Sequence, residues 1–556
     1  MAMTVAPTEL GSTARGPHDG AFRPPALGVR GVVSSAHNLA SQAGVRALMV
    51  GGNAVDAAVA VAATLAVVEP FMSGLGGGGG YMLIRDGKTG QVHGLDYLGR
   101  APRAARGDVW TDQEDVYSDV RSTIQPGPVA GWLAALERFG RLDRATVFSF
   151  AIEVAERGWP ISAFAHGMLV AAEARLARFA SSRAAYFVNG RVPRVGEIVP
   201  QPGMARSLRT IAEGGADVFY RGELGEEIVR AVQEAGGWLT MEDLADFQVR
   251  WVEPLAIQYR GNTVMTMPPG CSGIQYLESM KILEPFDLAA LGHNSAEYLH
   301  LLLETIKLAS ADRTAYTMDQ SVDHRSLLED EFVAGRRALI DRQRAAPSEG
   351  ERFRAQKDDL IPPGDPRRYQ RDNTTHFEAV DAEGNLVSVT HSNGGTFGNA
   401  FVAGATGIPM NNFIYWQDVN PESPNHIMPG RPLEMPMAPC IVTRDGAPIL
   451  GIGTPGSYGI LQTTLQMLLN RLDFGFNVQA AIEAPRVRAF ERTLVDAEAR
   501  IPAAALEGLR ARGHEVNVLA AWTAGVGGGH GVAIDPESGL LTGGADPRRD
   551  GAAIGW

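Results

Sequence analysis

Cysteine, basic charge and long apolar runs are all scarce in this chain of 556 residues. The two cysteines, Cys271 and Cys440, lie far apart in sequence, so they form neither a disulfide framework nor a four-cysteine zinc site. Basic residues number 50 and acidic residues 63, and the net charge of −13 argues against a nucleic-acid scaffold. The longest apolar run, residues 57–68, falls short of the roughly 18 residues that span a membrane. We therefore expect a globular protein in a reducing or redox-indifferent compartment, with neither nucleic acid nor membrane as a partner.

The N-terminus lacks the basic segment followed by an apolar segment that marks a secretory signal. Residues 1–25 are instead polar and rich in Gly and Pro, which predicts a flexible leader. On this basis we expect a cytoplasmic protein.

Common catalytic and cofactor motifs are also missing. The chain has no H-E-x-x-H, no Cys/His pair at metal-ligand spacing and no G-x-S-x-G, so we predict no metal, no cofactor and no conventional serine nucleophile. Residues 74–79 match G-x-G-x-x-G, but they follow a predicted helix and open a predicted strand, the reverse of a dinucleotide site. Close backbone packing is the better interpretation of these glycines, and of a second cluster at residues 525–531. His37 and His376 are interpreted as satisfied polar residues in or near the core.

Apolar spacing and turn signals predict helices over residues 36–50, 54–68, 132–139, 148–157 and 297–316, the last of them amphipathic. Residues 336–373 are charged, contain Pro-Pro-Gly and lose this periodicity, as a linker does. Directly afterwards, residues 374–380 and 386–390 alternate as two strands around a turn. A linker that delivers a threonine to the start of a buried hairpin suggests chemistry at that junction.

Asn373–Thr374 is the candidate reactive bond. A threonine hydroxyl can attack the preceding carbonyl, and hydrolysis of the resulting ester frees an N-terminal threonine. Its α-amine, with a reference pKa of about 7.7–8.0, then serves as a base for its own hydroxyl. The simpler interpretation is that Thr374 and Thr375 are two β-branched residues that begin a strand.

Several blocks in the same order give the chain its resemblance to a known family. These blocks are residues 52–60, 69–77, 126–131, 304–313, Thr374-Thr375-His376 and 543–549. Over nearly its whole length the chain resembles the γ-glutamyltransferase (glutathione hydrolase) family of N-terminal-nucleophile hydrolases. That resemblance strongly favours the catalytic interpretation of Thr374.

The resemblance implies an α+β fold, an αββα sandwich of two stacked antiparallel sheets between helical layers. It also implies cleavage between Asn373 and Thr374, giving a large fragment of residues 26–373 behind the leader and a small fragment of residues 374–556. Both fragments would remain in one interleaved domain as a heterodimer, which could itself dimerise. Thr374 would be the nucleophile and Ser392 would hydrogen-bond its amine. The backbone N–H groups of Gly456 and Ser457 would form the oxyanion hole, with Ser457 in place of the family's second glycine.

The substrate-binding positions depart from the family pattern. The arginine that holds the substrate carboxylate in the family is replaced by Leu98, after Tyr97, with Arg100 two residues on; the family's paired serines become Glu434 and Met435. On the amino side Gly394 follows Asn393, and Trp416 replaces an acidic residue, with Phe413 before it. Burying the carboxylate and the ammonium of a γ-glutamyl group without partners costs several kcal/mol. We therefore expect this site to bind a γ-glutamyl group weakly.

We therefore expect a self-processing amidohydrolase that acts on a small non-glutamyl amide, with water as the acceptor. Two alternatives remain. A loop shift could let Arg100 and Asn393 restore a γ-glutamyl site, or the scaffold could serve as a non-catalytic binding protein. Arg100 and Glu434 could either line the pocket or form a structural ion pair.

Overall fold

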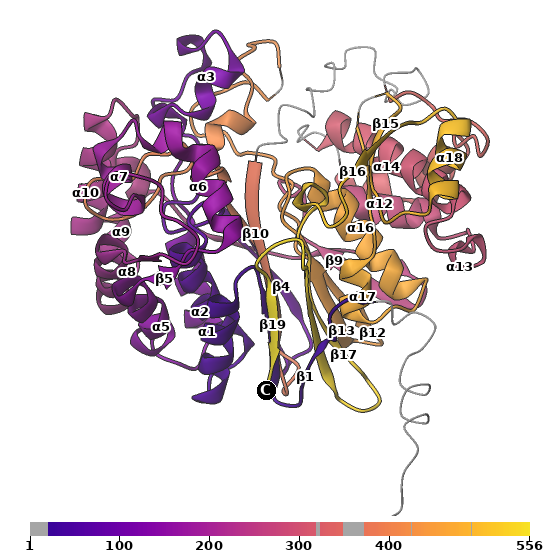
Figure 1. Cartoon of the computed structure of the whole chain (residues 1–556), viewed down its shortest axis with the longest axis horizontal. Helices are drawn as coiled ribbons and strands as arrows, with labels where there is room; N and C mark the ends of the chain where they lie inside the picture. The colour runs from indigo at the N-terminus through magenta and orange to yellow at the C-terminus, as the bar shows by residue number, and fades with distance from the viewer. Residues whose placement is uncertain (1–20, 318–322, 349–371, 424, 491) are drawn as a thin grey trace, which may run out of the picture.

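The computed structural model describes residues 21–317, 323–348, 372–423, 425–490 and 492–556, and its centre consists of two stacked seven-stranded antiparallel sheets. The first sheet has the order β1 (Ala26–Gly28), β18 (Leu541–Ala545), β17 (His530–Ile534), β13 (Ala447–Gly453), β12 (Ile441–Arg444), β9 (Asn262–Thr266) and β8 (Leu255–Tyr259). The second has the order β19 (Ala552–Gly555), β2 (Gly31–Ser35), β10 (Asp372–Asp381), β11 (Leu386–Gly395), β3 (Gly79–Arg85), β4 (Val92–Asp96) and β7 (Arg250–Val252). The two sheets lie face to face, with β10 and β11 against β17 and β13 (Figure 1).

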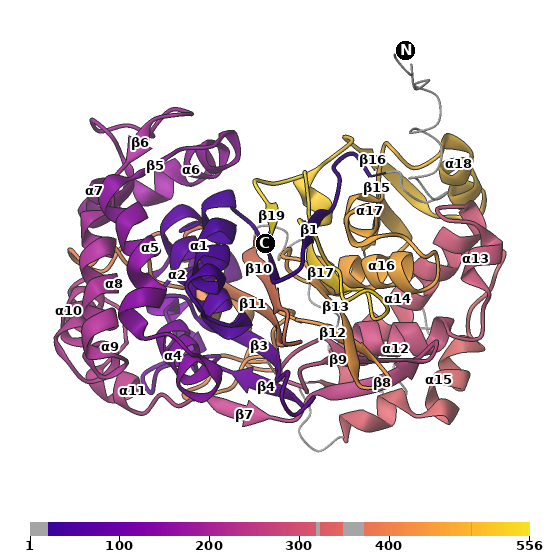
Figure 2. The same cartoon turned by 90° about the horizontal axis from the view of Figure 1, so that it is seen from below.

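Helices cover the outer face of each sheet (Figure 2). On the β10 sheet lie α1 (Asn38–Met49), α2 (Ala54–Val68) and α4 (Pro128–Phe139), with α5 (Arg144–Arg157) packed on α2 and α8 (Pro202–Gly214) packed on α5. On the β13 sheet lie α12 (Ile274–Leu283), α16 (Gly459–Leu472) and α17 (Val478–Glu483), with α14 (Ala296–Tyr316) packed on α12 and α18 (Ala503–Ala511) packed on α14. Each outer face has its own apolar core. The predicted αββα sandwich is confirmed.

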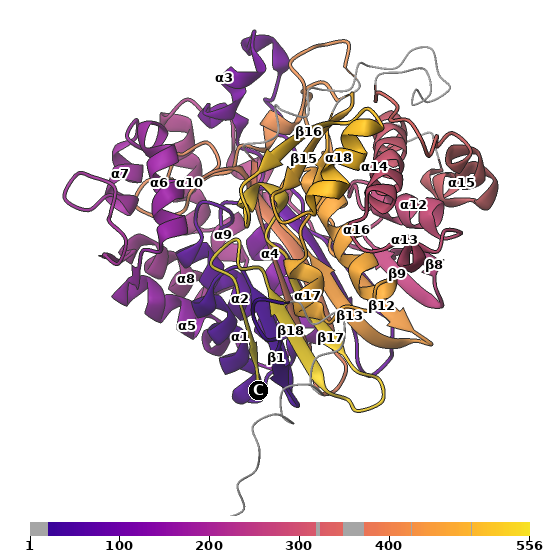
Figure 3. The same cartoon turned by 45° about the vertical axis from the view of Figure 1, so that its right-hand side comes forward.

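Smaller elements lie around this sandwich (Figure 3). They are α3 (Gln113–Tyr117), α6 (Ala163–Leu176), α7 (Ala180–Tyr186), α9 (Asp217–Tyr220), α10 (Glu223–Glu234), α11 (Met241–Ala245), α13 (Leu288–Leu291), α15 (Asp330–Arg337), the pair β5 (Trp159–Pro160) and β6 (Ile198–Val199), and the sheet of β14 (Val487–Ala489), β15 (Leu494–Glu498) and β16 (Glu515–Leu519). No helix in the described ranges is long and apolar enough to cross a membrane.

Helix α2 is the central helix of its layer. Asn53 caps it through a capping box with Asp56, and all of its residues are buried, as an Ala/Val-rich sequence predicts. It packs on β10 and β11, and it ends at Glu69, where the chain turns back towards β11.

Helix α14 differs from the predicted amphipathic helix, because charged side chains along it are buried in ion pairs. Glu304 accepts from Lys307 at 2.8 Å, and Asp312 pairs with Arg336 at 2.6 Å. Pairing offsets part of the cost of burying each charge, so charge spacing here did not mark a solvent-exposed face.

Both glycine clusters pack closely, as predicted. A side chain at Gly79, where β3 begins at a φ of +120°, would collide with the carbonyl of Tyr97. The second cluster runs into β17. The predicted linker lies mostly in residues 349–371, and the leader mostly in residues 1–20, outside the described residues. Arg23 is held to α17 by a hydrogen bond from its backbone N to Glu483 at 3.0 Å.

Candidate active site

The β10–β11 hairpin places Thr374 directly opposite Ser392. The Thr374 hydroxyl donates to Ser392 Oγ at 3.5 Å, and Ser392 Oγ also accepts from the backbone N of Gly394 at 2.8 Å. The strand register shifts between Asn373 and Thr374, the bond predicted to be cut. A bulge re-aims the chain locally and is a frequent neighbour of active sites.

Thr374, His376 and Glu378 alternate along β10 and therefore share the face that looks toward the β13 sheet. His376 Nδ1 lies 2.8 Å from the Thr390 hydroxyl, and His376 Nε2 lies 2.8 Å from Glu378 Oε1. Burial lowers the pKa of His376 and raises the pKa of Glu378 well above its usual range. His376 is thus a core residue with satisfied hydrogen bonds, as predicted. Its carboxyl partner, Glu378, was not predicted.

Glycines in β13 make room for this polar row. A side chain at Gly451 would meet the Glu378 carboxyl, and one at Gly453 would meet the His376 ring. Gly451 therefore lies opposite Glu378 and Gly453 lies opposite His376, so β13 and β10 run in opposite directions here. Beyond Gly453, the chain therefore leaves β13 at the end that corresponds to the Thr374 end of β10 and enters the loop of residues 454–458.

This loop carries the predicted oxyanion donors. Gly456 has a φ of +134° and Ser457 a φ of +57°, and their carbonyls accept from the N–H groups of Gly459 and Ile460, which start α16. Within the described ranges, the N–H groups of Gly456 and Ser457 donate to nothing. Two unengaged N–H groups at the N-terminus of a helix form a suitable cradle for an oxyanion.

Glu434 is held in a network of its own. Its Oε1 accepts from Ser272 Oγ and from Arg313 Nη1 at 3.3 Å, and its Oε2 accepts from the Tyr458 hydroxyl at 3.0 Å. The Arg313 guanidinium also lies 4.2 Å from the centre of the Tyr458 ring. The ion pair considered between Arg100 and Glu434 is therefore not formed, because Arg313, 121 residues before Glu434, takes its place.

Three predicted pocket residues follow β4 and have different surroundings. Tyr97 is fully buried, its hydroxyl 3.4 Å from His391 Nδ1 on the face of β11 away from the β13 sheet. Leu98 is half-buried, and its N–H donates to Asp96 at 2.9 Å. The side chain of Arg100 is exposed.

Asn393, Gly394, Phe413, Trp416 and Met435 complete the predicted set. Asn393 donates to the carbonyl of Pro70 at 3.0 Å, and Gly394 has a φ of +90°. Phe413 and Met435 are buried, and the Trp416 ring lies 5.6 Å from that of Tyr458. The structure thus brings Trp416 and Glu434 together around Tyr458, next to the oxyanion loop, while it places Tyr97 in the apolar core.

Sequence reasoning missed Ser272, Arg313, Tyr458 and Glu378. Glu378 could have been found from the period-2 alternation with Thr374, and Tyr458 from its place directly after Ser457. No local pattern connects Ser272 or Arg313 with Glu434.

One group of metal-ligand type side chains converges in the described residues: His300, Glu304 and His514. His300 Nδ1 lies 2.9 Å from His514 Nε2, and Glu304 is paired with the ammonium of Lys307. These contacts occupy the groups that a cation would need, so the cluster is explained as a structural hydrogen-bond network.

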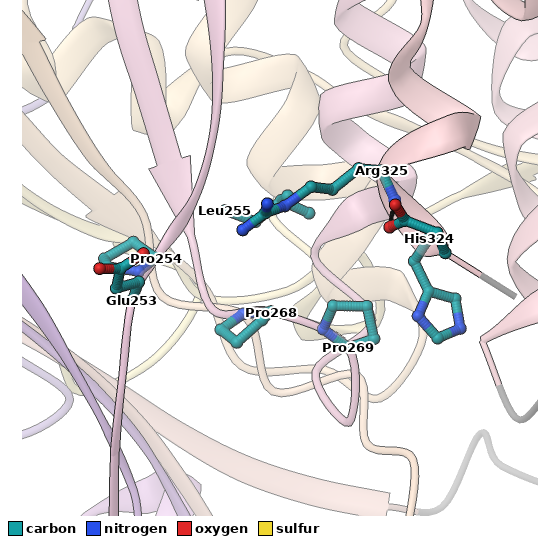
Figure 4. A pocket seen from close by; sticks show the side chains of 8 residues that line it. Glu253, Pro254, Leu255, Pro268, Pro269, His324 and Arg325 are labelled. Atoms are coloured by element: carbon teal, nitrogen blue, oxygen red, sulfur yellow. Dashed lines mark hydrogen bonds between the residues drawn. The ribbon is translucent and has the colours of Figure 1, made fainter. Parts of the chain in front are cut away.

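A surface pocket of about 150 Å³ has a lining that contains none of the predicted site residues (Figure 4). It is lined by Glu253, Pro254, Leu255, Pro268, Pro269, Asp323, His324 and Arg325. None of these residues was predicted from the sequence.

Comparison with known proteins identifies the family. The family model described as Gamma-glutamyltranspeptidase matches residues 40–556. The chain belongs to the γ-glutamyltranspeptidase family. Its relatives in this family are enzymes, and they are named as proenzymes.

Relatives of two kinds are about equally similar to this γ-glutamyltranspeptidase-family chain. The glutathione hydrolase proenzyme of Bacillus subtilis (strain 168) is 32% identical, over 95% of this chain and 92% of its own length. The acylase ACY 1 proenzyme of Pseudomonas sp. (strain SE83) is 34% identical, over 95% and 94%. Among solved structures, the cephalosporin acylase from Bacillus halodurans superposes with a TM-score of 0.86 at 31% identity, covering 100% of this chain and 99% of its own.

Proposed function

We propose that this protein is a self-cleaving amidohydrolase with Thr374 as its nucleophile. The observation that carries the proposal is the position of the Thr374 hydroxyl, 3.5 Å from Ser392 Oγ, at the end of β10 towards which β13 leads into the loop of Gly456 and Ser457. This arrangement supports Thr374 as the nucleophile, Ser392 as its hydroxyl partner and the Gly456 and Ser457 N–H groups as the oxyanion donors.

Maturation begins when Thr374 Oγ attacks the carbonyl of residue 373, with Ser392 as the neighbouring hydroxyl. The C–N bond breaks as the proton passes to nitrogen, and an ester forms. Water hydrolyses that ester and leaves a carboxylate on residue 373 and a free α-amine on Thr374. The amine is then a base close to neutrality, as a single-residue catalyst requires.

Turnover repeats the same chemistry on a substrate. Thr374 Oγ attacks the amide carbonyl, and the oxyanion accepts from the N–H groups of Gly456 and Ser457. Collapse expels the amine with the proton taken by the α-amine, and water releases the acid. Removing one such donor typically costs about 3–4 kcal/mol of transition-state stabilisation.

We propose that the acyl group is not γ-glutamyl. Glu434, at the place of a family serine, is buried in bonds to Ser272, Arg313 and Tyr458, and a carboxylate cannot donate a hydrogen bond to a substrate carboxylate as a serine hydroxyl would. Aromatic rings, Trp416 and Tyr458, lie beside it. The similarity to the acylase ACY 1 proenzyme supports an acylase rather than a glutathione hydrolase.

γ-Glutamyl hydrolysis is the second candidate, and it is favoured by the similarity to the Bacillus subtilis glutathione hydrolase proenzyme. A panel of p-nitroanilides separates the two. The proposal expects the matured wild type to hydrolyse simple acyl anilides at least tenfold faster than the γ-glutamyl anilide. The reverse order would establish the second candidate, and Thr374→Ala must be inactive in either case.

A further inference from the structure

The surface pocket of Figure 4 contains two opposite charges that are not paired. Within the described ranges, the guanidinium of Arg325 and the carboxylate of Glu253 form no hydrogen bond or ion pair, either with each other or with another residue. The other two polar side chains of the lining are engaged. Asp323 accepts from the backbone N of Arg325 at 3.1 Å, and His324 Nε2 donates to the carbonyl of Tyr316 at 2.9 Å. Arg325 and Glu253 are therefore the two charged groups that a ligand in this pocket can use.

These two charges come from separate elements on different sides of the pocket. Glu253 lies in the turn by which the chain passes from β7, at the edge of one sheet, to β8, at the edge of the other. Arg325 lies in the 3-10 helix η3 (His324–Leu328), before α15. Figure 4 shows its side chain extending across the pocket towards the side of Glu253 and Pro254. Opposite charges that are held on separate elements and are not paired with each other complement a ligand that carries both charges.

The rest of the lining is apolar and rigid. It consists of one buried leucine and three prolines, Leu255, Pro254, Pro268 and Pro269. Proline rings fix the backbone around them. The loop that carries two of these prolines is also fixed, because the carbonyl of Gly270 accepts from the Tyr81 hydroxyl at 2.6 Å and from the backbone N of Met435 at 2.9 Å. Walls that are in place before a ligand arrives reduce the entropy that binding costs.

The volume of the pocket limits its ligand to a small molecule. About 150 Å³ is less than the roughly 300–1,000 Å³ of sites that take drug-sized ligands. We propose that the pocket binds a free α-amino acid with an apolar side chain, at a site separate from the predicted catalytic residues. The ligand carboxylate pairs with Arg325, whose planar fork suits it, the ammonium pairs with Glu253, and the side chain lies against the proline rings. This proposal does not rest on the proposed function.

Leucine and two analogues that each lack one of its charges test the proposal by isothermal titration calorimetry of the full-length protein. Isopentylamine is leucine without the carboxylate, and 4-methylpentanoate is leucine without the ammonium. We expect L-leucine to bind with a dissociation constant below about 1 mM. Each analogue should bind at least about tenfold more weakly, because it leaves one protein charge without a partner.

Arg325→Met and Glu253→Gln each remove one charge of the pocket. Each substitution should weaken the binding of L-leucine at least about tenfold. Arg230→Met is the matched control, because Arg230 is an exposed arginine on α10, outside the lining of the pocket, and it should bind L-leucine as the wild type does. The side chains of Arg325 and Glu253 are exposed, so both variants should fold, and a melting temperature equal to that of the wild type checks this.

Three results would overturn the proposal. The first is no binding of L-leucine at about 1 mM. The second is an analogue with one charge that binds as tightly as L-leucine. The third is binding of L-leucine that Arg325→Met and Glu253→Gln leave unchanged, because the ligand would then occupy another site.

Discussion

Thr374 and Thr375 are adjacent, but their side chains lie in different environments. Thr374 faces the polar row of His376 and Glu378 between the sheets, whereas Thr375 faces the end of α2 and Glu69. The alternation of a strand thus places the two side chains on opposite faces of the sheet, and only Thr374 lies beside the row that contains the proposed site. Two β-branched residues at the start of a strand predicted the strand, but not this division.

Ser457 offers a test at the level of one residue. Its φ of +57° disfavours any residue with a side chain, and its hydroxyl is buried without a partner in the described chain. Ser457→Gly keeps the backbone N–H and removes the strain. We expect it to mature and turn over normally and to raise the free energy of unfolding by about 1 kcal/mol.

Ser149→Gly, in the exposed part of α5, is the control for Ser457→Gly. The same exchange in a helix should cost about 0.5 kcal/mol. Thermal unfolding of both variants, with the gel pattern of maturation, checks the pair. A destabilised or uncut Ser457→Gly would contradict the assigned loop conformation.

Glu69 predicts a pH dependence whose sign follows from burial. Its pKa rises from 4.5 to about 7 on folding, so the folded state binds this proton more tightly. The contribution of Glu69 to stability is therefore lost as pH rises from 4.5 to 7. Relative to its parent, Glu69→Gln should therefore gain free energy of unfolding as pH rises across this window. The gain should reach about 3 kcal/mol above pH 7.

The measurement compares melting temperatures at pH 5 and pH 8 in a Thr374→Ala background, which keeps the protein as one chain. A melting-temperature difference between Glu69→Gln and its parent that stays constant with pH would show that Glu69 does not titrate there.

The β10–β11 hairpin is the element that the sequence specified best. Its two strands and turn follow from alternation around Asp381–Asn385, and both strands extend further than predicted, to Asp372 and Gly395. The extension is stabilised by neighbouring strands and by Asn412, which accepts from Gly395 N at 2.7 Å. Such partners come from distant sequence, so local patterns could not show where the strands end.

Gly453 in β13 leaves space between the two sheets, and a side chain at this position would fill that space. A methyl group there would overlap the His376 ring, so Gly453→Ala should destabilise the protein by about 1–3 kcal/mol and slow maturation. Gly167→Ala, in α6 with open space around it, is the control and should stabilise by about 0.5–1 kcal/mol. Cleavage of Gly453→Ala at the wild-type rate would show that the β13 loop does not set the geometry of Thr374.

The pocket shows what local patterns miss. Glu434 looked like a lone charge whose partner could be Arg100, but its partners are Ser272, Arg313 and Tyr458. These residues meet only after α14, the loop after β9 and the start of α16 pack together. Ion pairs between distant residues leave no periodic signal, so the sequence could not show which residues surround Glu434.

At the scale of the whole molecule, the two sides of the predicted cleavage point share both sheets. In one sheet β10 and β11 lie between β2 and β3, and in the other β18 to β12 lie between β1 and β9. After cleavage neither fragment could leave without exposing strand edges and both apolar cores. We expect both fragments to co-elute in native size-exclusion chromatography and to separate only in denaturant.

A small fragment that elutes alone under native conditions would contradict this arrangement. The fold class itself was accessible from the sequence because several blocks in order matched one family, and the family model covers residues 40–556. Shared length, rather than any single motif, made that inference secure.

The central claim, that Thr374 is the nucleophile of a self-cleaving enzyme, is tested most directly by intact mass under denaturing conditions. The wild type should give two fragments that meet between Asn373 and Thr374, Thr375→Ala should give the same two, and Thr374→Ala should remain one chain of 556 residues. A single uncut wild-type chain, a cut elsewhere, or a cut in Thr374→Ala would contradict the account.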